Sequence, residues 1–482
     1  MSDVRPHPQR TLLVLTLPAL AYSLAQTMLV PAFGDMETEL HHSAADITWV
    51  LTSYLVSAAV FTPLVGRLGD QVGKRRMLVL SVLAFALGNL ISAVGGSYET
   101  VLGGRVVQGI AGGMFPLVFG ILRDEFAPEK VGSAIGFVSS TLGIGGGIGL
   151  LLGGAMVDSL GYTSIFWLGT IASVISVVTI QVLVPESPTR VPGRTDYRGA
   201  LLLSVGLVGG LLGVSQGEVW GWGDARVVVL LAGGPVVLVL WFFVQRATAE
   251  PLVDVQLLSS RPVLLTNLAT LLVGFGMFGA YVLVPQIVEA PASTGYGFGG
   301  SATHAGLLML PGSLCMFFFG PVSGTLGTRY GHQLSLFIGA VLSSLGLGLL
   351  AAFHGSDASI LVFFTIVTLG IAFAFAAMPN LIVASVPPTQ TGSATGFNAV
   401  VRSVGSSVGT QVTAVIVAST VVGTALPKES GFVTALGLCS GVSLLAAVLA
   451  ILVPSARTPH IRASEEIGAA SLLPDPALAA DA

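Results

Sequence analysis

Charged side chains are scarce in this chain of 482 residues. They make up 9% of it, whereas a typical soluble domain has about 25%. This small number of charged residues cannot cover the surface of a water-soluble protein of this length. A soluble globular enzyme is therefore excluded. A disordered chain is excluded as well, because disorder requires low hydrophobicity and 53% of these residues are hydrophobic.

Cysteine is almost absent, and the pair Cys315 and Cys439 is too little for a disulfide scaffold. The formal net charge of −4 gives no basic surface for nucleic acid. The sequence contains no GxxxxGK[ST] phosphate loop, no HExxH metal motif and no nucleophile motif. We therefore predict no enzyme activity, no metal site, no cofactor and no nucleic-acid partner.

Long apolar segments are abundant instead, and the mean hydropathy is +0.87. A helix needs about 20 apolar residues to cross the hydrocarbon core of a bilayer, and such segments recur along the whole chain. The alternating ten-residue pattern of a membrane β-barrel does not occur. We predict an all-α polytopic membrane protein with 14 transmembrane helices, at 11–33, 47–66, 77–95, 101–121, 131–156, 164–184, 199–215, 227–244, 263–285, 305–326, 334–352, 360–382, 393–419 and 433–453.

The loops between these segments alternate in charge. If the N-terminus is cytoplasmic, all but four of the 20 basic residues fall on the cytoplasmic side. Arg226 and Lys428 fall outside, and Arg105 and Arg402 lie within spans. The positive-inside rule then places both termini in the cytoplasm. Because arginine far outnumbers lysine, as in high-GC bacterial genes, we predict a bacterial cytoplasmic membrane.

The two ends of the chain repeat each other. GSAIGFVSSTLGIGGGIG at 132–149 aligns with GSATGFNAVVRSVGSSVG at 392–409, an offset of 260, and PLVGRLGDQVGK at 63–74 aligns with PVSGTLGTRYGH at 321–332, an offset of 258. The first six spans thus match the last six, and a central helix pair is left over. Parallel repeats of this kind enclose a cavity between two halves. The predicted parts are a tail at 1–10, six-helix halves at 11–184 and 263–453, a linker with two helices at 185–262, and a tail at 454–482.

The segment after the second span reads GRLGDQVGKRRML, at 66–78. It resembles the loop signature of the major facilitator superfamily, G-x-L-a-D-r-x-G-r-k-x-x-l. In that family the loop latches one of two alternating states. The resemblance implies a latch made of the matching residues and of an aspartate at the inner end of span 4: Gly66, Asp70, Gly73, Lys74, Arg75 and Asp124. The alternative is a basic turn that only obeys the positive-inside rule.

Span 4 begins LGGRVVQGIAGG, at 102–113. It is similar to the family pattern l-x-x-R-x-x-q-G, with Arg105, Gln108 and Gly109 matching. The resemblance implies a role for Arg105 in proton relay. An arginine within a span is costly and needs a protein or water partner, but this one lies only about a turn inside. Snorkelling to the interface is therefore the alternative.

Span 5 contains GGGIGLLLGG, at 145–154. It resembles the antiporter motif g-x-x-x-G-P-x-x-G-G, although Leu150 stands where the proline is expected. The matching glycines are Gly145, Gly149, Gly153 and Gly154. Three of them repeat every fourth residue, which also predicts a smooth face for ordinary helix packing. Fourteen spans with a central pair are similar to the drug:proton antiporter branch of the superfamily.

The sequence departs from that branch in span 1, where Ala25 occupies the position of an acidic residue. No carboxylate lies well inside any span. A proton carrier needs a pKa near the working pH, which burial of a carboxylate can supply. Asp35 and Glu289 follow corresponding prolines in repeat-related spans, so we predict them as carriers. The alternative is that they are solvated charges at the mouth.

Polar and aromatic residues inside spans are the expected lining of a central cavity. They are Gln26, Trp49, Tyr54, Tyr281, Asn380, Asn398, Arg402 and Gln411. Arg402 lies near the middle of its span, at the repeat position of Leu142. An intramembrane ionisable residue indicates function, and two roles remain open: binding an anionic substrate group, or neutralising a buried carboxylate.

The resemblance and the residues together predict a secondary active exporter of hydrophobic or amphipathic small molecules, of the antibiotic or multidrug efflux kind. It would work by proton antiport with alternating access. Its partners would be the lipid bilayer, the substrate and protons, and we expect a monomer. Proton-coupled uptake and a transport-dead sensor or scaffold are the alternatives.

Overall fold

The computed structural model describes residues 8–188, 190, 193, 195–420 and 426–454. The tails predicted at 1–10 and 454–482 lie almost wholly outside these residues. Within the described part, 14 helices are long and apolar enough to cross a membrane. The predicted number and order of spans is therefore confirmed, and most helices extend a few residues beyond the predicted ends.

In its described residues, the first half of the chain forms eight α-helices. Apolar segments adopt helices because a helix satisfies its own backbone polar groups in lipid. The helices are α1 (Pro8–Thr27), α2 (Phe33–Leu40), α3 (Ala44–Val72), α4 (Lys74–Val94), α5 (Tyr98–Gly109), α6 (Met114–Glu125), α7 (Pro128–Leu160) and α8 (Thr163–Leu183). A glycine-rich 3-10 turn, Ile110–Gly113, joins α5 to α6, so these two form one span.

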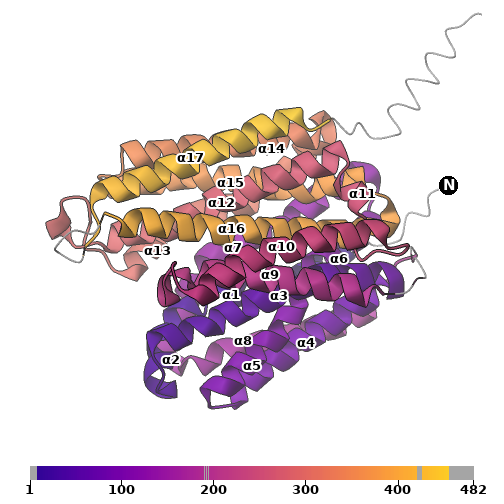
Figure 1. Ribbon diagram of the computed structural model, residues 1–482, viewed down its shortest axis with the longest axis horizontal. Coiled ribbons are helices and arrows are strands. Elements are labelled where there is room, and N and C mark those ends of the chain that lie inside the picture. The colour runs from indigo at the N-terminus through magenta and orange to yellow at the C-terminus, as the bar shows by residue number, and fades with distance from the viewer. Residues whose placement is uncertain (1–7, 189, 191–192, 194, 421–425, 455–482) are drawn as a thin grey trace, which may run out of the picture.

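The described part of the second half forms nine α-helices. They are α9 (Tyr197–Trp220), α10 (Ala225–Ala247), the short α11 (Val255–Leu258), α12 (Arg261–Glu289), α13 (Ala302–Tyr330), α14 (His332–Ala352), α15 (Asp357–Ser385), α16 (Thr391–Ala418) and α17 (Glu429–Leu452). In Figure 1 the long helices run side by side, with α1 to α8 below and α12 to α17 above.

The two halves make the same tight turn at the same place. Gly73 separates α3 from α4 with φ +125°, and Gly331 separates α13 from α14 with φ +102°. Only glycine adopts such backbone angles without strain. We call the end of the bundle that carries these two turns the latch end, and the opposite end the far end; the latch end lies to the right in Figure 1.

Span 1 differs from its prediction. A continuous helix was expected over 11–33, but α1 ends at Thr27 and a 3-10 turn at Val30–Ala32 precedes α2. Pro31 lies in that turn, and proline removes a backbone donor and ends a helix. The repeat-related helix α12 instead continues through Pro285 to Glu289. The two halves therefore end differently at the far end.

The halves meet along two seams. In the α7–α13 seam, Cβ atoms added at Gly136 and Gly320 would each lie within 2.6 Å of the other's carbonyl oxygen. In the α3–α16 seam, one added at Gly396 would lie 3.0 Å from the carbonyl oxygen of Thr62. Gly136 and Gly396 are equivalent in the sequence repeat, and so are Thr62 and Gly320. The two seams are thus repeat-related contacts.

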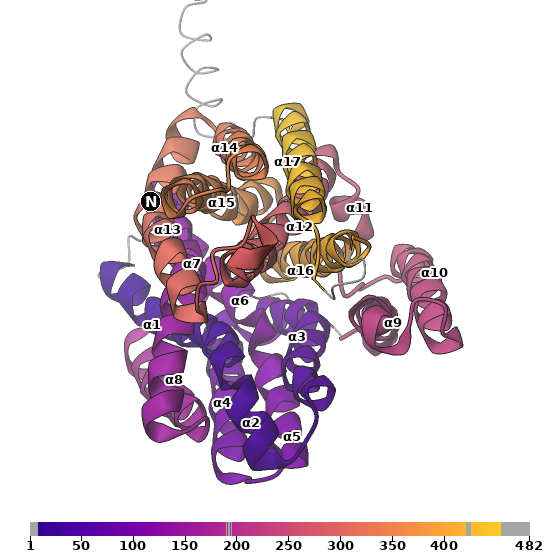
Figure 2. The same cartoon turned by 90° about the vertical axis from the view of Figure 1, so that its left-hand side faces the viewer.

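The central pair, α9 and α10, lies outside the bundle next to the α3–α16 seam (Figure 2). Trp220 of α9 contacts Trp49 of α3, with ring centroids 6.4 Å apart. Trp241 of α10 stacks on Phe397 of α16 at 6.0 Å and 10°. The pair therefore touches both halves.

Candidate functional site

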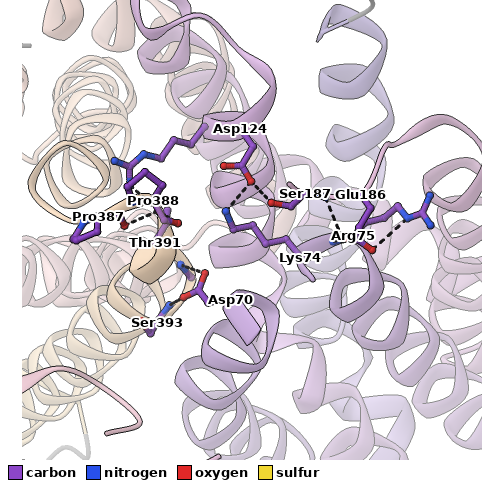
Figure 3. Close-up of polar contacts among 12 residues, drawn as sticks. Asp70, Lys74, Arg75, Asp124, Glu186, Ser187, Pro387, Pro388, Thr391 and Ser393 are labelled. Atoms are coloured by element: carbon purple, nitrogen blue, oxygen red, sulfur yellow. Dashed lines mark hydrogen bonds and ion pairs between the residues drawn. The ribbon is translucent and has the colours of Figure 1, made fainter. Parts of the chain in front are cut away.

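The side chain of Asp70 joins the two halves at the latch end (Figure 3). Its carboxylate accepts hydrogen bonds from the backbone nitrogens of Gly392 (3.1 Å) and Ser393 (3.0 Å). These nitrogens belong to the first turn of α16, where N–H groups lack helical partners and the helix dipole favours negative charge. Asp70 is only 1% exposed. One half thus caps a helix of the other.

The approach of α3 to α16 beside Asp70 requires glycine on both helices. A Cβ atom at Gly66 would lie 2.3 Å from the carbonyl oxygen of Gly392, and one at Gly392 would lie 2.5 Å from that of Gly66. Either contact is too short for real atoms. The glycines therefore set the spacing that lets Asp70 reach the helix end.

Other latch residues tie the N-terminal half to itself. Lys74 Nζ lies 2.7 Å from Asp124 Oδ2, and both side chains are buried. Ser187, just after α8, donates a hydrogen bond to the same carboxylate oxygen. Glu186 accepts from the backbone nitrogen of Arg75 at 3.1 Å. This network fixes α4, α6 and the segment after α8 against one another.

Arg123 is a second bridge between the halves, and the sequence interpretation missed its role. Its Nη1 donates to Thr391 Oγ1 at 2.7 Å and its Nη2 to the carbonyl of Val386 at 2.9 Å. It was identified only as one basic loop residue among many. Its place next to Asp124, at the end of α6 that faces the start of α16, was the available signal.

Arg105 is buried and does not snorkel. It is 1% exposed, its Nε donates to the carbonyl of Val50 at 3.0 Å, and its Nη1 donates to Gln108 Oε1 at 2.6 Å. Its guanidinium carbon lies 4.2 Å from the ring centroid of Tyr54. Arg105 therefore holds α5 against α3 inside the N-terminal half.

Three of the four motif glycines in α7 face α1. Added Cβ atoms would lie 1.9 Å from Ser23 Oγ at Gly145, 1.9 Å from Thr27 Oγ1 at Gly149, and 2.4 Å from the carbonyl of Met28 at Gly153. Gly154 has space, since its nearest neighbour would be Pro31 Cβ at 3.9 Å. The helix α7 is continuous through residue 150, as expected without a proline there.

The two predicted proton carriers do not meet the central bundle. Asp35 lies in α2, half-buried, and Glu289 is the exposed last residue of α12. Both are at the far end. The structure does not bring them together with Arg105 or with each other. The buried carboxylates Asp70 and Asp124 lie at the opposite, latch end.

A small cavity lies between the halves at the middle of the bundle. Four helices line it, with Phe115, Phe119, Ser139 and Leu142 from the N-terminal half, and Phe375, Pro379, Thr395, Asn398, Ala399 and Arg402 from the C-terminal half. Its volume is about 10 Å³, which is room for about one water molecule. In this conformation the centre of the molecule is nearly filled.

Of the eight predicted cavity residues, Asn398 and Arg402 line this cavity. Asn398 also donates to Asn267 Oδ1 (2.8 Å) and Thr270 Oγ1 (2.9 Å) on α12. Arg402 lies with its guanidinium carbon 4.8 Å from the ring centroid of Phe375.

The other six lie elsewhere in this conformation. Asn380 on α15 donates to the carbonyl of Gly132 on α7, and Trp49 faces the central pair. Tyr54 is packed beneath Arg105, and Tyr281 packs edge-on against Phe364. Gln26 in α1 and Gln411 in α16 are half-buried outside the cavity lining.

Two halves, a polar latch and a cavity between them are the architecture of alternating-access transporters. A family description, the Major Facilitator Superfamily, matches residues 15–410 of the chain. The chain belongs to this superfamily. It is accordingly a multi-pass membrane transporter of small molecules rather than an enzyme.

Several bacterial superfamily transporters are similar to it in sequence. The tetracenomycin C resistance and export protein of Streptomyces glaucescens is 28% identical over 87% of this chain and 78% of its own. A multidrug resistance protein B homolog of Mycobacterium tuberculosis is 28% identical over 82% of this chain and 72% of its own. Multidrug resistance protein 3 of Bacillus subtilis is 25% identical over 82% and 77%.

Solved structures show the same superfamily fold. A crystal structure of a human organic anion transporter superposes with a TM-score of 0.65 at 18% identity, covering 92% of this chain and all of that one. A proton:xylose symporter superposes with a TM-score of 0.63 at 13% identity, covering 93% and 96%.

Proposed function

We propose that the protein exports amphipathic small molecules, antibiotics or other drugs among them, from the bacterial cytoplasm by alternating access. The observation that carries this proposal is the pairing of Asp70 with the first turn of α16. These bonds hold the two halves together at the latch end, while the central cavity is nearly filled. They break if the halves separate at that end. The names of the bacterial relatives support export of drugs.

In this proposal the segments 11–184 and 263–453 move as two bodies, and the linker 185–262 joins them. The latch end faces the cytoplasm, because nearly all basic residues belong to loops on that side. When the latch opens, substrate reaches the cavity from the cytoplasm. When it closes, substrate leaves toward the far end.

Proton antiport is the proposed source of energy. Arg105 would then act within the relay by holding α5 on α3, and Asp35 and Glu289 remain the proposed carriers. Their positions at the far end, with Glu289 exposed and Asp35 half-buried, suit exchange with the external solution. No resident cofactor is needed for this coupling.

The test uses inside-out membrane vesicles that hold a proton gradient, with a pH-sensitive dye and a panel of lipophilic drugs. Export by antiport predicts that some drugs dissipate the gradient and that an Asp70→Asn variant responds far less. Labelled drug that accumulates without any dye signal would contradict proton coupling. If no drug accumulates, export itself is wrong, and an assay of uptake by whole cells then separates an importer from a scaffold.

A further inference from the structure

We propose that the central cavity binds an amphipathic organic anion, with Arg402 as its counter-ion and Phe115, Phe119 and Phe375 as the surface for its apolar body. This inference rests on the proposed function, because it names the chemical class of the exported substrate. It follows from the charges around the cavity and from the way the two halves share its lining.

Among the described residues, Arg402 is a cation with no anionic partner. It lies midway along α16, and its guanidinium group is placed over the Phe375 ring. Within the described ranges, no side chain or carbonyl forms a hydrogen bond or ion pair with that group. An uncompensated charge at mid-membrane depth costs several kcal/mol. A bound anionic group would offset that cost.

Arg105 shows how this chain treats an arginine that serves packing. It is also buried within a span, but it donates to Val50 and Gln108 and stacks on Tyr54. These partners take up two of its three guanidinium nitrogens inside one half, while Nη2 is buried without a hydrogen bond. Among the described residues, the guanidinium of Arg402 has no such partners, and its side chain lines the cavity instead. The two intramembrane arginines therefore have different tasks.

The cavity is lined by equivalent positions of the two halves. Four pairs of lining residues are each 260 positions apart, the same offset as the sequence repeat: Phe115 and Phe375, Phe119 and Pro379, Ser139 and Ala399, and Leu142 and Arg402. Exact repeat symmetry would put similar residues at both members of the last pair. The C-terminal half instead has an arginine opposite a leucine, so the repeat alone does not account for this charge.

The remaining lining residues extend that asymmetry. Thr395 and Asn398 line the cavity from α16, whereas the matching positions on α7 are Ile135 and Val138. The C-terminal half therefore supplies a hydroxyl, an amide and a guanidinium beside the Phe375 ring, and the N-terminal half supplies two phenylalanines, a leucine and the hydroxyl of Ser139. The only charged residue in the described lining belongs to the C-terminal half.

An amphipathic anion matches the chemistry of this lining, and it would enter once the halves separate and the cavity widens. A carboxylate or sulfonate would accept hydrogen bonds from Arg402 in a charge-assisted geometry, and an aromatic body would pack against the phenylalanines. A lipophilic cation would meet the positive charge of Arg402, and none of the lining residues is a carboxylate that could neutralise it. The sign of the charge would thus discriminate among drugs.

The test measures binding of three fluorescent probes to the purified full chain in detergent, with empty micelles as background. The probes 1-pyrenebutyrate, 1-pyrenebutylamine and 1-pyrenebutanol share an aromatic skeleton and differ in charge. We expect the carboxylate to bind at least about tenfold more tightly than the amine, a difference equal to about 1.4 kcal/mol. Equal affinities, or tighter binding of the amine, would overturn the proposal without any variant.

Two substitutions then assign the preference to Arg402. Arg402→Gln removes the charge and should lower the affinity for the carboxylate about tenfold while leaving that for the alcohol unchanged. Arg402→Lys should keep part of the preference, because it keeps the charge but not the planar fork. Arg246→Gln is the matched control, since Arg246 is exposed at the end of α10 and its loss changes the net charge equally.

Thermal unfolding of each variant shows whether it is folded. A folded Arg402→Gln protein with the unaltered carboxylate-to-amine ratio would overturn the assignment; if Arg402→Gln does not fold, the ratio in Arg402→Lys decides. The vesicle assay separates this inference from the proposed function. Carboxylate preference without any drug export leaves the anion site standing and removes export. Export of drug cations unaffected by Arg402→Gln leaves export standing and removes the anion site.

Discussion

At the scale of single residues, Asp70 shows how one buried carboxylate can serve a moving molecule. It is paired with backbone N–H groups rather than with a basic side chain of the other half. Such bonds are strong while they last, at about 1.5–3 kcal/mol each for a charged partner. They hold a helix end that any large movement of α16 would carry away. The closed state is therefore stabilised without a permanent tie.

An Asp70→Asn substitution should weaken this closed state. The amide keeps one oxygen as acceptor, but its NH₂ group would face a backbone donor. One of the two bonds is then lost, and the transport rate in vesicles should fall at least about tenfold, as expected for a loss above about 1.4 kcal/mol.

Glu129→Gln is the control for that change. Glu129 is exposed at the first turn of α7, at the same end of the bundle. Its substitution removes one negative charge without touching the α3–α16 seam, so transport should stay near the wild-type rate. Equal losses in both variants would show that Asp70 acts only through the overall charge of this end.

Asp70 and Gly66 could be predicted from the sequence because the pattern that contains them is local. Arg105 was recognised as costly, but its partners could not be predicted. Val50 offers a backbone carbonyl, a group that occurs in every helix, and only the packing of α5 on α3 selects it. Gln108 lies on α5 itself, three residues after Arg105.

At the scale of helices, α7 depends on two glycine faces. Gly145, Gly149 and Gly153 lie against α1, and Gly143 and Gly147 lie against Met316 and Ser313 of α13. At these positions the helix has no side chain on either face, so it can approach both neighbours at backbone distance.

A Gly149→Ala substitution tests this packing. Its methyl group would lie 1.9 Å from Thr27 Oγ1, a hydroxyl that donates to the carbonyl of Gly145. Overpacking of this kind costs about 1–3 kcal/mol, so the unfolding temperature in detergent should fall by several degrees.

Gly154→Ala provides the comparison, because its methyl group would meet only Pro31 Cβ at 3.9 Å. Both glycines match the same sequence motif, so the motif alone predicts equal effects. The structure predicts a lower unfolding temperature for Gly149→Ala and an unchanged one for Gly154→Ala. Equal melting curves for the two variants would refute the packing account.

The number and order of the helices could be predicted, but their rotation could not. In a soluble protein the polar face of a helix marks its exposed side. Here the lipid-facing and cavity-facing sides are both apolar, so Phe115, Phe119 and Phe375 carry no signal that separates them from residues in contact with lipid. For the same reason Trp49 and Tyr281 were placed in the cavity by residue type, whereas they face other helices.

At the scale of the whole molecule, the proposed alternating-access cycle requires the latch end to open and close. Arg123 and Thr391 face each other there across the halves, 2.7 Å apart at their polar atoms. A double Arg123→Cys, Thr391→Cys variant joined by a short bis-thiosulfonate linker should therefore bind substrate but transport almost none. The natural Cys315 and Cys439 are first replaced by serine.

The same double variant without the linker serves as its control and should retain measurable transport. Mass spectrometry gives the fraction that is linked. Transport that continues at the unlinked rate when nearly all molecules are linked would show that the halves do not separate at this end.

The two seams are equivalent in the repeat, yet they differ in extent. Along α7, Gly132, Gly136, Gly143 and Gly147 all touch α13, whereas on α16 Gly392 and Gly396 touch α3 while Gly405 and Gly409 face α12. The charge of Asp70 lies in the shorter seam only, and its repeat position holds Thr328. If the halves rotated about a hinge along α7 and α13, the longer contact would stay intact. The α3–α16 seam would then open next to α9 and α10, and this helix pair would have to bend with it.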